Sequence, residues 1–83
     1  MRKMKSLKHD TTINVVQHIT IKNGWEYYIT DEDTGDKDVK VCLVVGFETE
    51  LGDVYIPEIE PYIVTRTPIL KGLMAAPDWE WIN

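Results

Sequence analysis

The chain has 83 residues, a length typical of one small domain. It carries nine basic and fourteen acidic side chains, a formal net charge of −5, and 43% of its residues are hydrophobic, which is enough for a globular core. A single cysteine, Cys42, excludes a disulfide within the chain, and no apolar run approaches the roughly 20 residues that span a bilayer. Residues 1–9 are basic but lack the apolar stretch of a secretory signal, so we expect a cytoplasmic protein with no membrane partner.

The charge is unevenly distributed along the chain. Four basic residues lie in the first eight positions, where there are no acids. Residues 1–10 are therefore predicted to be a flexible basic tail, and residues 11–83 a single small α+β domain. Residues 9–83 hold five basic and fourteen acidic side chains, a net charge of −9. Because basic side chains must neutralise phosphates, this acidic body disfavours direct nucleic-acid binding and favours a basic protein partner or cations.

Four strands are predicted from the hydrophobic pattern. Residues 12–21 alternate between apolar and polar side chains, and residues 25–30 do the same, as half-buried strands do. Residues 39–47 are the most apolar segment and are predicted to form the central strand, closed by a glycine that could mark a bulge. Residues 54–56 form a short fourth strand. The side chains expected on the core side of the central strand are Val39, Val41, Leu43, Val45 and Phe47.

Two helical segments are predicted after the fourth strand. Pro57 suits the first turn of a helix, and Pro61 limits that helix to about one turn. A second helix is predicted over Pro68–Ala76, with Thr67 as its N-cap and Pro77 ending it. Residues 78–83 are expected to be extended. The apolar stripe of the second helix consists of Ile69, Leu70, Leu73 and Met74.

The predicted fold class is α+β. A four-stranded antiparallel meander is followed by a short helix, and the C-terminal helix packs on one face of the sheet. The structural alternative is a partly open SH3-like barrel, in which residues 57–62 are the single turn before the last strand.

An Asn-Gly pair between two apolar runs indicates a β-hairpin, and its register decides which aromatic residues are buried. A two-residue loop would mix apolar and polar side chains on both faces of the hairpin. A three-residue loop, Lys22–Gly24, gives one aliphatic and aromatic face and one polar face, and it places Gly24 where a left-handed residue is needed. Burial of large apolar side chains therefore favours the three-residue loop. This register sends Trp25 and Tyr27 inward, and Tyr28 outward beside His18.

No motif in the sequence indicates catalysis or a metal site. Residues 31–38 begin like a calcium loop, but the sixth and twelfth positions hold Asp36 and Cys42 instead of the required glycine and glutamate. The loop is expected to be a solvated hairpin tip. Cys42 lies in an apolar run and is expected to be a buried small side chain, and His9 and His18 lack further ligands at a zinc-like spacing. We therefore expect no enzyme activity, no metal and no cofactor.

Exposed aromatic and acidic side chains are the candidates for an interaction surface, because interfaces are enriched in Trp and Tyr. Trp79 and Trp81 have the alternative of covering the core. The candidate interaction residues are Tyr28, His18, Tyr55, Glu48, Glu50, Asp53, Glu58, Glu60, Trp79 and Trp81.

These features favour a non-enzymatic protein-interaction module. Its partner is expected to be a protein, and a second copy of the chain, giving a homodimer, is one candidate. The alternative function is an acidic inhibitor that mimics nucleic acid and occupies the basic groove of a DNA- or RNA-binding protein.

Residues 25–60 contain a Trp-led strand, an acidic turn, a Cys-Leu strand, a turn with the letters TELG and a short segment rich in glutamate. This order resembles the core of a family of small plasmid- and phage-borne proteins of unknown function. The family has PE where this chain has Thr49-Glu50, and its apolar ending is not matched. The resemblance implies only a mobile-element context.

Overall fold

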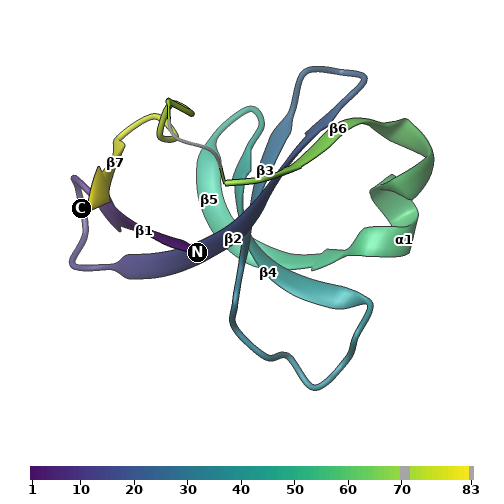
Figure 1. Cartoon of the computed structure of the whole chain (residues 1–83), viewed down its shortest axis with the longest axis horizontal. Helices are drawn as coiled ribbons and strands as arrows, with labels where there is room; N and C mark the ends of the chain where they lie inside the picture. The colour runs from purple at the N-terminus through teal and green to yellow at the C-terminus, as the bar shows by residue number, and fades with distance from the viewer. Residues whose placement is uncertain (70–71, 83) are drawn as a thin grey trace.

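The computed structural model describes residues 1–69 and 72–82. It contains seven antiparallel strands in one sheet and a single short helical segment (Figure 1). The elements in chain order are β1 (Arg2–Ser6), β2 (Thr12–Ile21), β3 (Glu26–Thr30), β4 (Val39–Val45), β5 (Thr49–Tyr55), α1 (Ile56–Ile59), the 3₁₀ turn η1 (Glu60–Tyr62), β6 (Ile63–Pro68) and β7 (Trp79–Ile82).

The strand order in the sheet is β5-β4-β3-β2-β1-β7, and β6 also pairs with β2. The long strand β2 makes this possible. Residues 12–15 of β2 pair with β1, and residues 17–21 pair with β6, so two strands share one edge of β2 while β3 occupies the other. As a result β1 and β7 form one end of the molecule, and β6 and α1 form the other (Figure 1).

The predicted α+β class is wrong. Strands make up 55% of the chain and helix only 9%, and the described part of the C-terminal region contains no helix. Strand β6 continues through Pro68, where the helix was expected to begin, because it pairs with β2. Gly72 has a φ of 95°, which is incompatible with a right-handed helix. Leu70 and Lys71 of the expected helix, and Asn83 of the expected extended end, lie outside the described residues.

The central part of the sheet has the expected neighbours. Strands β2, β3, β4 and β5 pair successively, each antiparallel to the next. The strand predicted over residues 54–56 corresponds to β5, which is longer than expected and spans Thr49–Tyr55. A seven-residue helical segment, residues 56–62, precedes β6. Strands β1 and β7 were absent from both the predicted meander and its barrel alternative, and they change the shape of the core.

The expected flexible tail is instead part of the sheet over residues 2–6. Strand β1 pairs with β2 on one side and with β7 on the other. Met4 has no exposed surface, so this strand is anchored by burial. Two ion pairs join the same regions, from Lys5 to Glu80 at 3.3 Å and from Lys8 to Asp78 at 3.2 Å.

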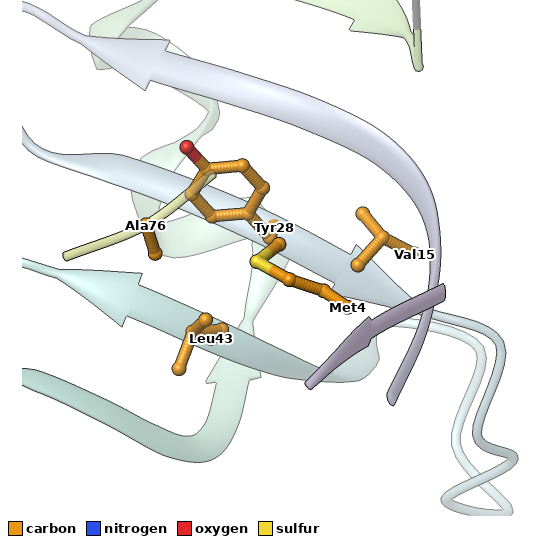
Figure 2. Packing of buried hydrophobic residues seen from close by; sticks show 5 residues of the cluster. All are labelled: Met4, Val15, Tyr28, Leu43 and Ala76. Carbon is orange, nitrogen blue, oxygen red and sulfur yellow. The ribbon is translucent and has the colours of Figure 1, made fainter. Parts of the chain in front are cut away.

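Two small cores lie on opposite faces of the central strands. The first core lies beneath β1 and the segment before β7, and its buried members are Met4, Val15, Tyr28, Leu43 and Ala76 (Figure 2). The second core lies beneath α1 and β6, and its buried members are Ile19, Ile21, Tyr27, Ile29 and Cys42. The expectation of one apolar and one polar face is therefore wrong for the central strands, since both faces are covered.

The predicted hairpin register is confirmed. Tyr27 lies opposite Ile19 and Tyr28 opposite His18, as the three-residue loop requires. Gly24 closes the loop with a φ of 90°. The register shifts by one residue near the far end of the hairpin, because a bulge falls between residues 15 and 17.

Candidate functional site

The sheet ends on one side at β5, whose outer side is open. Strand β5 pairs with β4 along its whole length, from Thr49 opposite Val45 to Tyr55 opposite Val39. Within residues 1–69 and 72–82, no strand pairs with its other side. Five of its seven residues are exposed and the other two are half-buried. Alternate backbone N–H and C=O groups of this strand therefore face solvent. We call residues 49–55 the β5 edge.

The turn between β4 and β5 carries an exposed aromatic side chain. A Cβ atom at Gly46 would lie 2.8 Å from three atoms of the Trp25 ring, so the glycine allows the indole to pack against the turn. Phe47 follows and makes an edge-to-face contact with Trp25, with ring centroids 5.3 Å apart. The Phe47 side chain is nevertheless 95% exposed. The expectation that Phe47 lies on the core side is wrong because β4 ends at Val45 and Phe47 belongs to the turn.

Acidic side chains line the β5 edge and the helical segment after it. Between Lys40 and Arg66 the sequence has five carboxylates and no Lys, Arg or His. All five are exposed. Among the described residues, only one of them forms an ion pair, from Glu60 to Arg66 at 2.8 Å. These five are the acidic residues predicted at an interaction surface, namely Glu48, Glu50, Asp53, Glu58 and Glu60.

Apolar side chains lie between these acids on one face of the β5 edge. Successive side chains in a strand alternate between faces, so Leu51, Asp53 and Tyr55 share one face and Glu50 lies on the other. Leu51 is 40% exposed and Tyr55 is 51% exposed. Tyr55 was predicted at an interaction surface, whereas Leu51 and Phe47 were not. The signal that could have indicated Phe47 is its position in the turn, between Gly46 and the charged Glu48.

The predicted surface pair Tyr28 and His18 is buried. Tyr28 is 1% exposed and His18 is 6% exposed, and the centroids of their rings lie 4.8 Å apart. The Tyr28 hydroxyl donates a hydrogen bond to the Met74 carbonyl at 3.0 Å. His18 Nε2 shares a hydrogen bond with Glu26 Oε1 at 3.0 Å. Burial and the neighbouring Glu26 carboxylate raise the pKa of Tyr28 to about 12, so this hydroxyl stays protonated at neutral pH. The Tyr28 hydroxyl therefore holds the C-terminal segment on the sheet, and neither side chain offers an exposed surface.

Trp79 and Trp81 are half-buried and pack against the first core. The Trp81 Nε1–H donates to the Leu73 carbonyl at 2.7 Å. Its ring lies edge-to-face with Tyr28 at 6.2 Å, and the Arg2 guanidinium stands 4.6 Å from the ring centroid. These contacts fit the alternative in which the two tryptophans cover the core.

An open groove of about 910 Å³ lies between the loop of residues 31–38 and the helical segment of residues 56–62. Val16, Ile29 and Ile56 line it, as do Glu60 and Arg66, which form an ion pair. A second hollow, of about 540 Å³, lies between the β4–β5 turn and Trp79. Among the described residues, no three His, Cys, Asp or Glu side chains are arranged to hold a metal ion.

Cys42 is fully buried in the second core, as predicted. Burial, reinforced by the Asp53 carboxylate, raises the pKa of its thiol to about 12. The thiol is therefore protonated at neutral pH and out of reach of a substrate. In the described part of the chain, no helix has the length and apolar character needed to cross a membrane.

Comparison of the chain with models of protein families, with curated proteins and with solved structures gives no match in any of the three.

Proposed function

We propose that this protein is a non-enzymatic protein-interaction module that binds its partner at the β5 edge. The observation that carries the proposal is the open outer side of β5, seven residues long and exposed over most of its length. An unpaired strand edge is a template for pairing with another chain. Phe47, Leu51 and Tyr55 add exposed apolar surface along the same strand and its turn, and aromatic side chains are enriched at interfaces.

A second copy of the chain is the less suitable occupant of this edge. Two copies related by a two-fold axis present the same surface to each other. Edge-to-edge pairing would then bring together two strands that each carry Glu50 and Asp53, and the negative charges of the two edges would repel each other. The acidic edge therefore favours a different protein over a homodimer. The lone cysteine fits the cytoplasm, where thiols remain reduced.

The test is capture of a partner on the immobilised full chain, followed by calorimetry with the purified partner. The variant Leu51→Ser/Tyr55→Ser alters the β5 edge. The matched control is Tyr62→Ser/Val64→Ser, which removes two side chains of similar exposure, 55% and 62%, outside that edge.

We expect the β5 variant to weaken binding by about tenfold or more and the control to bind like the wild type. Equal binding by both variants would overturn the β5 assignment. If the partner is a DNA- or RNA-binding protein and nucleic acid displaces the chain, the nucleic-acid mimic is the correct function instead. A twofold increase in mass in sedimentation that the control variant alone abolishes would identify a homodimer through another surface.

A further inference from the structure

We infer that the partner segment recognised at the β5 edge is an extended peptide rich in lysine and arginine, which adds to the sheet as an eighth strand. This inference rests on the proposed function and names the chemistry of its partner. It requires an edge that can accept a strand and a charge pattern that selects the incoming side chains.

The β5 edge has the regularity that strand addition needs. Its pairing with β4 runs through seven consecutive residue pairs without a register shift. At about 3.3 Å per residue the edge is roughly 20 Å long, enough to pair with a segment of six or seven residues. The other open edges are less suitable, because β7 has only four residues and β6 ends at a proline and pairs with β2 through a register shift.

The charge around the edge selects a basic occupant. The segment between Lys40 and Arg66 contains five carboxylates and no basic side chain. Glu50 on one face and Asp53 on the other place a carboxylate on each side of the added strand. A lysine or arginine opposite each of these residues, three positions apart on the incoming strand, would meet the two carboxylates across the new pairing.

The apolar side chains define a further preference. Leu51 and Tyr55 flank Asp53 on the same face, so an aliphatic residue of the incoming strand can lie against Leu51. An arginine can stack on the exposed Tyr55 ring, where a guanidinium interacts favourably with the aromatic face. The preferred segment therefore carries a basic residue opposite each of Glu50, Asp53 and Tyr55 and an aliphatic residue opposite Leu51.

The same acids have a simpler explanation, which the experiment must separate from recognition. Charged side chains on an edge strand prevent edge-to-edge aggregation without binding anything. Only recognition predicts that a basic peptide pairs with the β5 backbone. The decisive measurement is therefore made on backbone amides and not only on affinity.

The probe, called the lysine peptide, is Lys-Thr-Lys-Thr-Val-Lys-Thr, which matches residues 55 to 49 in an antiparallel pairing; it is titrated into the ¹⁵N-labelled full chain. Two control peptides accompany it. The first has the same sequence with alternate backbone nitrogens methylated, which keeps the charge and removes the hydrogen bonds needed for a strand. The second replaces each lysine with glutamate. The variant Glu50→Lys/Asp53→Lys is measured beside the wild type.

We expect the lysine peptide to shift the amide resonances of residues 49–55 and to slow hydrogen exchange at every second amide of this strand. Methylation should weaken binding by about tenfold or more, because several backbone hydrogen bonds are lost. The glutamate peptide should not bind, and the charge-reversed variant should lose the lysine peptide. Raising the salt from about 50 to about 500 mM should weaken binding, because exposed charges are screened.

Equal affinity for the methylated and unmethylated peptides, or shifts spread over all acidic regions without slowed exchange in β5, would overturn the inference. If the captured partner depends on Leu51 and Tyr55 but the lysine peptide leaves β5 unchanged, the inference fails and the proposed function stands. If neither the partner nor the peptide responds to any change in β5, both fail.

Discussion

Replacing Gly46 with alanine should destabilise the protein, because the new methyl group has no space. The added Cβ atom would lie 2.8 Å from three atoms of the Trp25 ring, so the ring must retreat by about 0.6 Å to reach ordinary contact at 3.4 Å. The ring cannot simply swing away, since it packs against the second core and contacts Phe47. Overpacking of this kind costs about 1–3 kcal/mol, and each kcal/mol lowers the Tm of a domain this size by about 4–8 °C.

The chain offers a matched control in the same hairpin. A Cβ atom at Gly52 has no neighbour within 4 Å and needs no positive φ. Gly52→Ala should therefore leave the free energy of unfolding unchanged or raise it by up to about 1 kcal/mol, because alanine loses less conformational freedom on folding. Urea unfolding followed by circular dichroism gives both values, and unchanged m-values would show that stability alone has changed.

Coupling between Gly46 and Trp25 is tested by a double-mutant cycle. In a Trp25→Leu background the ring is absent, so Gly46→Ala should lose most of its effect. The reasoning is refuted if Gly46→Ala is as stable as Gly52→Ala, or if its destabilisation is the same with and without the indole.

Three further predictions concern the buried side chains. Tyr28→Phe should lower the free energy of unfolding by about 0.5–1.5 kcal/mol, because the Met74 carbonyl loses its donor; equal urea midpoints would contradict this. Met4→Ala should cost about 2–5 kcal/mol in the same assay, because the side chain is fully buried, whereas a residue in a flexible tail would cost nothing. The raised pKa of Cys42, about 12 against 9.0 unfolded, gives stability that is complete below pH 9 and is lost as pH rises toward 12. Unfolding by urea between pH 8 and about 11 should show this decline, and a thiol reagent should label Cys42 at neutral pH only after urea is added; rapid labelling of the native chain would contradict the buried site.

The hairpin around Gly24 was predictable because its signals are local and agree. The Asn-Gly pair, the glycine at the left-handed position and the alternation on both sides all select one register, and the structure has Tyr27 opposite Ile19. The same alternation could not reveal that both faces are covered. The cover on the Tyr28 face comes from β1 and the segment before β7, and no local pattern connects residues so far apart in the sequence.

The C-terminal helix was predicted from an apolar spacing that suits a helix, yet Pro68 belongs to a strand. Pairing of β6 with β2 outweighs this local preference, and Gly72 adopts a conformation that a helix excludes. The acidic residues of the candidate site lie along β5 and the helical segment. They are close together in the sequence, so their proximity in the structure could be predicted. The burial of Tyr28 and His18 depends on the distant strands and was therefore missed.

The two cores are built from stretches of the chain that differ in length. The second core and the side chains packed on it come from residues 19–63, whereas the first core joins Met4 to Ala76 and to β7. Closing a longer loop costs more entropy and slows folding. During synthesis, the second core can assemble once β6 has left the ribosome. The first core, which contains Tyr28, cannot be completed until residues 73–82 have been synthesised. A nascent chain stalled between these points would expose that apolar face and would be a substrate for chaperones.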